Sequence, residues 1–497
     1  MMIFSLLSAL YARAFGSSNY EAGLTIAPTS DGGFIVAGQT YGVGAGDYDI
    51  VVIKMSPVGT AQWIRTYGGP GWEAPGAIIT TTDGGYAVAG GTGSWGAGSY
   101  DALVFKLNSD GSVAWARVFG GSSYEMLYDI IQVSDGYAVC GYTSSIGSGE
   151  SDFLLLKLGT NGALSWGRVF GSIYDETSFG VAQTPDGGYA VVGETEVSGT
   201  DWDALAVKYT STGTFGWARR ISAGTMPERA CEVIPVAGDS LAIGGFTLNS
   251  GTGYYMFWFF KMSGTGSLGW GRAYGGGNTT YCYDMVSSGD GGFLLGGETR
   301  ASGAGGFDYG FMKINSAGTL QWARTWGTTS ADDGYHIALG TDGIGMTGWT
   351  YGIGPGGGDI LILKTDLNGN YPACVQSWSP STISPTMSSA SQTGGSSWTP
   401  TNSAVSLTTT SPNWTPTDAC VPVEASEEQT RPQGIICVSG AKKLIFISDR
   451  EAELRVYSVD GSLAFSKRIR HGENDVQLAP GVYIWKAGPW VGRAILR

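Results

Sequence analysis

The chain is poor in charged residues, which make up 14% of its 497 residues, and it contains only two histidines. Acidic residues outnumber basic ones, so the formal net charge is −14. Because phosphate backbones are bound by basic faces, this charge excludes nucleic acid as an expected partner. No run of about 18 apolar residues occurs, so no membrane-spanning helix is predicted. The six cysteines lack CxxC spacing and show no metal-ligand pattern.

Glycine and aromatic residues are abundant instead, with 82 glycines and 12% aromatics. The glycines do not recur at every third position, which excludes a collagen-like chain. The aromatic content is too high and the charge too low for a disordered chain. This composition favours many short strands that are joined by tight turns.

One sequence block recurs seven times in the first 370 residues. It follows the pattern T-x-D-G-G-aromatic-x-V-x-G, then a glycine-rich stretch, D-x-x-x-x-K and W-x-R-x-aromatic-G. The lysine of the block returns every 51 to 53 residues, as Lys54, Lys106, Lys157, Lys208, Lys261, Lys313 and Lys364. Repetition at a near-constant period indicates a repeat architecture.

Each copy contains four short runs with strand character, which in the first copy are residues 23–29, 33–40, 49–56 and 61–67. A unit of four strands that is repeated seven times is typical of a β-propeller. The sequence therefore predicts an all-β fold with a seven-bladed β-propeller over residues 1–370. A linear β-solenoid is the structural alternative.

The two ends of the repeat region complement each other. Six copies carry a tryptophan nine residues after the lysine, but the position after Lys364 is Ala373. The missing strand is found at the N-terminus, as Tyr11-Ala12-Arg13-Ala14-Phe15-Gly16. We expect this N-terminal strand to complete the last blade and close the ring, which removes two open sheet edges.

Residues 371–433 lack the repeat and are rich in serine, threonine and proline. This composition is typical of an extended linker. Cys374 and Cys420 bracket most of the segment and would either form a disulfide in an oxidising compartment or stay as two free thiols.

Residues 434–497 contain alternating apolar runs, and a small C-terminal β-sandwich is the natural interpretation. Leu454–Gly461 and Leu478–Ile484 resemble the paired motifs of the C-terminal sorting domain of type IX secretion cargo, although the usual Pro-Asn-Pro opening is absent. The resemblance implies that residues 434–497 engage the secretion machinery, and that the protein crosses the outer membrane and is released or attached at the surface.

The repeats resemble those of bacterial secreted propeller proteins with S-D-G-G-Y-x-V-x-G repeats, as in Thr82–Gly90. This second resemblance implies a secreted or cell-surface location without defining a ligand. The apolar stretch Met2–Leu10 is short and lacks a preceding basic residue, so we expect the N-terminal signal peptide to be missing or truncated.

A set of acidic and aromatic residues precedes the first strand of several blades. Its members are Tyr20, Glu21, Trp72, Glu73, Tyr124, Glu125 and Glu176. If these loops lie at one mouth of the ring, the carboxylates would bind sugar hydroxyls or Ca²⁺ and the rings would stack on sugars. In the alternative interpretation, each glutamate bonds its own loop. No other cofactor is expected.

The remaining polar repeat residues suit structural roles, since an aspartate in each turn bonds its own backbone. Cys231 and Cys282 occupy equivalent inner-strand positions of blades five and six, so we expect them to be neighbours that a disulfide would link. The two histidines, His336 and His471, lie in different predicted domains, so no Ser-His-Asp arrangement is indicated.

The sequence thus favours a monomeric binding or adhesion module for a glycan or an extracellular protein. No catalytic constellation is found, so we do not expect an enzyme. Two alternatives stay open: an extracellular carbohydrate-active enzyme with acids at the propeller mouth, and a structural component of the surface layer.

Overall fold

The computed structural model describes residues 10–371 except 199–200 and 225–226, residues 375–418 with several short gaps, and seven strands between residues 435 and 496. All elements assigned in these residues are β-strands, and none of the described residues forms a helix that could cross a membrane. The chain divides into two compact units, Met1–Pro422 and Val423–Arg497.

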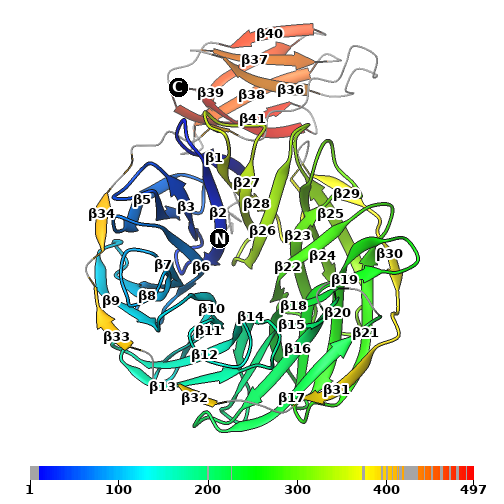
Figure 1. The fold of residues 1–497 in the computed structure, drawn as a ribbon. Coiled ribbons are helices and arrows are strands. Elements are labelled where there is room, and N and C mark those ends of the chain that lie inside the picture. The colour runs from blue at the N-terminus through cyan, green and yellow to red at the C-terminus, as the bar shows by residue number, and fades with distance from the viewer. Residues whose placement is uncertain are drawn as a thin grey trace. The chain divides into compact units, whose positions relative to one another are not determined.

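Seven antiparallel sheets surround a central axis in the first unit (Figure 1), which confirms the predicted seven-bladed propeller. The innermost strands are β2 (Glu21–Pro28), β6 (Glu73–Thr80), β10 (Glu125–Val133), β14 (Glu176–Gln183), β18 (Glu228–Val236), β22 (Thr280–Ser287) and β26 (Asp332–Leu339). The second strands are β3 (Phe34–Tyr41), β7 (Tyr86–Thr92), β11 (Gly136–Thr143), β15 (Tyr189–Ser198), β19 (Ser240–Asn249), β23 (Phe293–Thr299) and β27 (Ile344–Thr350).

The outer half of each blade follows the same order. The third strands are β4 (Tyr48–Met55), β8 (Asp101–Leu107), β12 (Asp152–Gly159), β16 (Asp201–Tyr209), β20 (Tyr254–Ser263), β24 (Asp308–Ile314) and β28 (Asp359–Thr365). The fourth strands are β5 (Ala61–Gly68), β9 (Val113–Gly120), β13 (Leu164–Phe170), β17 (Phe215–Ser222), β21 (Leu268–Gly275), β25 (Leu320–Trp326) and, in blade seven, β1 (Tyr11–Phe15).

The first strand of the chain closes the ring, as the repeat count predicts. β1 pairs antiparallel with β28, from Tyr11 opposite Lys364 to Phe15 opposite Ile360. The last blade therefore contains strands from both ends of the repeat region. This pairing leaves blade seven without an open edge between its third and fourth strands.

The serine- and threonine-rich segment differs from the expected linker. Its described part supplies a fifth, outermost strand to every blade, and we call these seven strands the outer belt (Figure 1). The belt strands of blades one to seven are β34 (Thr408–Thr410), β33 (Thr401–Ala404), β32 (Ser396–Trp398), β31 (Ser388–Gln392), β30 (Ser381–Ile383), β29 (Gln376–Trp378) and β35 (Thr417–Asp418). Serine and threonine suit this role, because an edge strand needs backbone pairing on one side and polar side chains toward water.

Neighbouring blades are joined by repeated contacts of the W-x-R motif. In six blades the arginine lies over the tryptophan two residues before it, at 5.1 to 5.9 Å from the ring centroid. In blade three Arg168 also donates to the carbonyl oxygens of Gly213 and Thr212, in a turn of blade four. The motif therefore packs one blade against the next.

The aspartates of the D-G-G turns pair with the repeat lysines. Nζ lies 2.6 to 3.0 Å from the carboxylate in blades one to four, six and seven. Blade five is the exception, because Asp239 has a φ of 50° and Lys261 donates to the carbonyl of Ser316 instead. These aspartates thus have the structural role that was expected of them.

The second unit consists of two antiparallel sheets. One sheet has the order β36 (Ile435–Gly440), β37 (Lys443–Ser448) and β40 (Gly472–Val476). The other has the order β39 (Leu463–Ile469), β38 (Ala452–Ser458), β41 (Gly481–Ala487) and β42 (Trp490–Leu496). Both motifs of the sorting-domain resemblance contain strands, β38 and β41. The packing of the two sheets as a sandwich stays a prediction.

Candidate functional site in the central channel

Every innermost strand carries a register shift at the same place. The pairing with the second strand skips one residue in each blade, and the skipped residues are Leu24, Gly76, Tyr128, Phe179, Cys231, Tyr283 and Tyr335. A β-bulge redirects the side chain of the extra residue. All seven of these residues line one cavity of about 660 Å³ in the central channel.

The side chains around this cavity differ strongly in size between blades. At the level of the bulges, blades one and two contribute small or flexible residues, which are Leu24, Ala74 and Gly76, whereas Trp72 and Tyr100 of blade two lie at the mouth. Blades three, four, six and seven contribute aromatic rings at the bulge position. At the level of the bulges, the channel is therefore filled by rings of blades three, four, six and seven and open beside blades one and two, so the cavity has two unlike walls.

The filled side is a chain of aromatic contacts, which we call the aromatic wall. Tyr128 lies 6.2 Å from Tyr142 and 5.2 Å from Phe179 between ring centroids. Farther along, Tyr283 is stacked on Tyr335 at 4.9 Å. At the mouth lies a separate aromatic cluster, in which Tyr100 of blade two is stacked on Tyr124 at 5.5 Å and meets Trp72 edge-on at 4.9 Å. Ring faces at such positions are suited to sugars, apolar ligands and cations.

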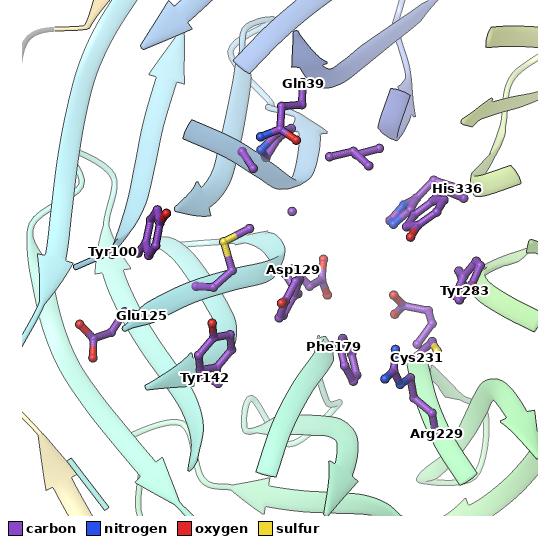
Figure 2. A pocket seen from close by; sticks show the side chains of 18 of the residues that line it. Gln39, Tyr100, Glu125, Asp129, Tyr142, Phe179, Arg229, Cys231, Tyr283 and His336 are labelled. Atoms are coloured by element: carbon purple, nitrogen blue, oxygen red, sulfur yellow. The ribbon is translucent and has the colours of Figure 1, made fainter. Parts of the chain in front are cut away.

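Arg229 is built into the aromatic wall (Figure 2). Its guanidinium group lies 4.4 Å from the ring centroid of Phe179 and 5.3 Å from that of Phe246. Nε and Nη2 donate to the two carboxylate oxygens of Glu194, and both hydrogen bonds are 2.7 Å long. Burial raises the pKa of Glu194, and the arginine charge opposes this rise. The two charges of the Arg229–Glu194 ion pair therefore compensate each other, and both carboxylate oxygens accept a hydrogen bond from the arginine.

Four polar residues follow the bulges of blades three, five, six and seven, and we call them the acidic belt. They are Asp129, Glu232, Asp284 and His336. Burial raises the pKa of Asp129 to about 7, and the charge of Asp284 contributes. Burial and the charges of Asp129 and Asp284 also raise the pKa of Glu232. His336 Nδ1 lies 3.3 Å from Asp284 Oδ2.

Part of the acidic belt also links neighbouring blades. Asp129 accepts the backbone N–H of Val181 at 2.8 Å, and Asp284 accepts that of Ile337 at 2.9 Å. Thr25 makes the same link from blade one, accepting from Ile78 at 3.1 Å. Glu232 accepts only from its own neighbour Val233 among the contacts described, at 2.9 Å. Glu232 thus contributes an acid to the cavity without a link to the next blade.

A second cavity of about 490 Å³ lies beyond the acidic belt. Its lining is largely aliphatic and includes Ile79, Ile131, Ile234 and Val286. The belt residues Asp129, Glu232 and His336 border both cavities. The channel therefore has an aromatic part and an aliphatic part, with charged groups between them.

The glutamates that were predicted to line the mouth are buried. Glu21, Glu73, Glu125 and Glu176 are at most 1% exposed. Each accepts the backbone N–H four residues before it and the hydroxyl of a threonine on the second strand, as Glu73 does from Gly69 at 2.8 Å and Thr92 at 2.7 Å. The alternative that each glutamate bonds its own loop describes this geometry. Only Glu125 borders the cavity.

These glutamates are also paired with an aspartate of the preceding blade. Gly68 lies against both Asp49 and Glu73, and a side chain there would overlap Oδ1 of Asp49. Burial and the charge of Glu73 raise the pKa of Asp49, although backbone N–H groups oppose this rise. The junction of blades five and six lacks both acids, since Met256 of blade five and Thr280 of blade six lie against the equivalent Gly275. At this junction, the residues equivalent to Asp49 and Glu73 are therefore both replaced by uncharged residues.

The predicted aromatic residues have different positions. Trp72 and Tyr124 line the cavity, and Tyr100 connects them. Tyr20 forms a bridge to Gly358 and is not among the lining residues. Tyr100, Tyr128, Phe179, Arg229 and Tyr283 were missed, because the repeat pattern has no fixed residue type at their positions. Aligning the seven copies would have shown aromatic residues facing Leu24 and Gly76.

The structure corrects the disulfide that was suggested for blades five and six. Cys231 and Cys282 are both buried, free thiols. The bulge explains the difference: Cys231 is the skipped residue of β18, whereas Cys282 pairs in register with Gly297. The two side chains therefore do not occupy equivalent positions. Cys374 and Cys420 lie outside the described residues.

Among the described residues, no group of three or more His, Cys, Asp or Glu side chains is placed to hold a metal ion. Binding of Ca²⁺ or of sugar hydroxyls by the predicted glutamates stays a prediction.

No protein-family model matches the chain, and no curated protein matches it significantly. Among solved structures, it is similar to PorZ, an essential surface component of the type IX secretion system of Porphyromonas gingivalis, with 11% identity and a TM-score of 0.41. That match covers 95% of this chain and 59% of PorZ. Sqt1 from Chaetomium thermophilum matches with 10% identity and a TM-score of 0.39, over 72% of this chain and 99% of Sqt1. Likeness at this level says nothing about ligand or partner.

Proposed function

We propose that the chain is a secreted cell-surface binding protein that takes its ligand into the central channel. The observation that carries the proposal is the cavity of about 660 Å³ between the small residues of blades one and two and the aromatic wall. Pockets of this size with a few polar groups are typical of ligand sites. The sorting-domain resemblance supports export by type IX secretion through residues 434–497, and the repeat resemblance supports a secreted or cell-surface location.

The unequal walls favour a binding role over a purely structural one. A ring of seven similar repeats can fill its axis with similar residues, as the buried blade interfaces do. Here the bulge residues change from Leu24 and Gly76 to Tyr128, Phe179, Tyr283 and Tyr335. The unfilled space costs van der Waals contacts that a structural ring would gain by filling it.

The aromatic mouth favours a glycan among extracellular ligands. Tyr100 and Tyr124 are 36% and 43% exposed, so their rings are accessible at the entrance. Exposed ring faces stack on the apolar faces of sugars, while nearby polar groups bind the hydroxyls. We therefore propose a glycan, or a protein segment with similar groups, as the ligand.

One observation favours a carbohydrate-active enzyme as the second candidate. Asp129 and Glu232 both line the cavity, and burial raises the pKa of each carboxyl. Glycosidases use a pair of carboxyl groups, one of them with a raised pKa. Asp129 accepts two backbone N–H groups, which favours a structural role for it and places this candidate second.

The test is a glycan array and a polysaccharide pull-down with the full chain, scoring reducing-end release together with binding. We expect binding without release, and loss of binding in the Tyr100→Ala/Tyr124→Ala double variant. Tyr254→Ala is the matched control, because Tyr254 is similarly exposed, at 38%, and does not line the cavity. Release of sugar would favour the enzyme, and binding that survives the double variant would contradict the channel site.

A further inference from the structure

We infer that the ligand of the channel carries an organic ammonium group, which binds between the aromatic wall and the acidic belt. This inference rests on the proposed function, because it names the chemical class of the ligand for the same site. A glycan with a free amino group, a diamine or a lysine side chain would each supply such a group.

The charges around the cavity are the first argument. Arg229 is the only lysine or arginine among the lining residues, and both of its bonds go to Glu194. Two acids at the base of the cavity, Asp129 and Glu232, have no cationic partner among the contacts described. A ligand cation would supply the missing positive charge, since each carboxylate can accept further hydrogen bonds.

The aromatic wall is the second argument. Cations are attracted to ring faces within about 6 Å of the centroid, most strongly where water is excluded. Tyr128, Tyr283 and Tyr335 each lie one position before a residue of the acidic belt, which is Asp129, Asp284 and His336 in turn. These rings line the same cavity as the carboxyl groups of Asp129 and Glu232, so an ammonium group there would be within reach of both.

Arg229 provides an internal precedent for this arrangement. Its guanidinium group is held by the rings of Phe179 and Phe246 and by the carboxylate of Glu194. The same wall therefore already binds one cation through rings and a carboxylate together. The unpaired acids of the belt offer the same combination to a second cation, which the chain does not supply.

An inorganic ion fits the belt less well. No group of three or more potential metal ligands is found among the described residues. Ca²⁺ requires six to eight oxygen ligands, whereas an ammonium group needs only about three acceptors and also gains from ring faces.

The test compares two probes of equal length, 1,5-diaminopentane and 1,5-pentanediol, by isothermal titration of the full chain. We expect the diamine to bind at least about tenfold more tightly, because hydrogen bonds to charged groups are stronger than those between neutral groups. In the Asp129→Asn/Glu232→Gln variant this preference should fall at least about tenfold. Asp290→Asn removes an exposed acid of the turn between β22 and β23, which lines neither cavity, and should leave the preference unchanged.

The outcomes separate this inference from the proposed function. Equal binding of both probes, or an equal loss in Asp290→Asn, would overturn the ammonium inference. If neutral glycans bind in the channel and the diamine does not, the inference fails while the proposed function holds. Should Asp129→Asn disturb folding through its link to Val181, Glu232→Gln alone serves as the test, because Glu232 makes no such link.

Discussion

At the scale of single residues, the hydrogen-bond partners of the buried glutamates determine whether these acids hold a loop or bind a ligand. Glu73 is completely buried and accepts hydrogen bonds from Gly69 and Thr92. Asp49 of the preceding blade lies beside it. An acid that is engaged in this way holds a loop and is not free to bind a ligand.

Glu73→Ala should therefore destabilise the propeller and leave ligand affinity unchanged. The variant leaves the N–H of Gly69 and the hydroxyl of Thr92 without their acceptor, which should cost about 2–4 kcal/mol. The measurement is chemical unfolding of the full chain, followed by titration of the folded variant. A cost below about 0.5 kcal/mol would contradict the structural role, since that is the size of an ordinary surface change.

The junction of blades five and six suggests a matched variant. Met256 and Thr280 replace both acids there. The double variant Asp49→Met/Glu73→Thr imitates this junction and should unfold at higher denaturant concentration than Glu73→Ala. If the double variant is less stable than the single one, the two positions are not coupled as the repeat comparison suggests.

The sequence could predict the buried pairs only in part. The repeat pattern aligns Glu21, Glu73, Glu125 and Glu176 at one position. Hydrogen bonding of each glutamate to its own loop was one of the two interpretations of this pattern. Their burial depends on the threonine that each second strand places opposite them, as Thr92 pairs with Glu73 in register. Spacing along the chain does not reveal such a cross-strand contact.

At the scale of elements, the bulge and the outer belt are the features that the repeat pattern does not reveal. The bulge puts Tyr128 rather than Leu127 into the cavity, while Leu127 is completely buried in the blade. A strict two-residue alternation fails at such a point. The cavity lining was therefore missed although all seven blades were predicted.

The outer belt should be required for a stable propeller. Trp378 of β29 is 7% exposed and lies 6.0 Å from Phe257 between ring centroids. Ile383 and Met387 pack against a second core cluster, which contains Trp258. A chain that ends at residue 371 should lose at least about 5 °C in Tm and aggregate through its open edges.

The control for this truncation ends at residue 422, the boundary of the first compact unit, and keeps the belt. Both chains lack the second unit, so their difference reports on the belt alone. Equal Tm values by calorimetry for the two chains would show that the belt strands add nothing to stability.

The carboxyl pairs between blades predict a pH dependence of stability. Burial and the charge of the neighbouring Glu176 raise the pKa of Asp152 to about 6. Burial also raises the pKa of Asp308 to about 7 and that of Asp359 to about 6. A folded-state pKa above the unfolded value contributes stability that is present below about pH 4 and lost as pH rises through 6 to 7.

The turn aspartates act in the opposite direction. Although partial burial opposes it, hydrogen bonds from Thr29, Lys54 and Gly33 lower the pKa of Asp31 to about 2. This contribution is present above about pH 4 and lost as pH falls toward 2. Thermal unfolding should therefore give a higher Tm at pH 5 than at pH 8, and a lower Tm again below pH 3. A Tm that rises steadily from pH 5 to pH 8 would contradict the buried carboxyl pairs.

At the scale of the whole molecule, the seven-bladed ring and its closure by the N-terminal strand could be predicted from the sequence. The constant period of the repeat gave seven blades, and the missing W-x-R strand placed β1 beside β28, because an incomplete blade must find its strand elsewhere. The candidate ligand site could not be predicted from the repeat pattern. It depends on differences between repeats, whereas the fold depends on what the repeats share.

The central claim is that ligand binds in the channel beside blades one and two. Leu24 occupies the bulge position at which blades three, six and seven carry tyrosine, so Leu24→Tyr adds a side chain that the fold accepts elsewhere in the ring. The variant would fill part of the open side of the cavity. Its Tm should stay within a few degrees of the parent chain.

The most direct measurement is isothermal titration of the parent chain and Leu24→Tyr with 1,5-diaminopentane and with the glycans that bind on the array. The account predicts that the parent chain binds at least one of these and that Leu24→Tyr lowers its affinity at least about tenfold. Full affinity in the folded Leu24→Tyr variant, or no binding by the parent chain, would contradict a ligand site in the channel.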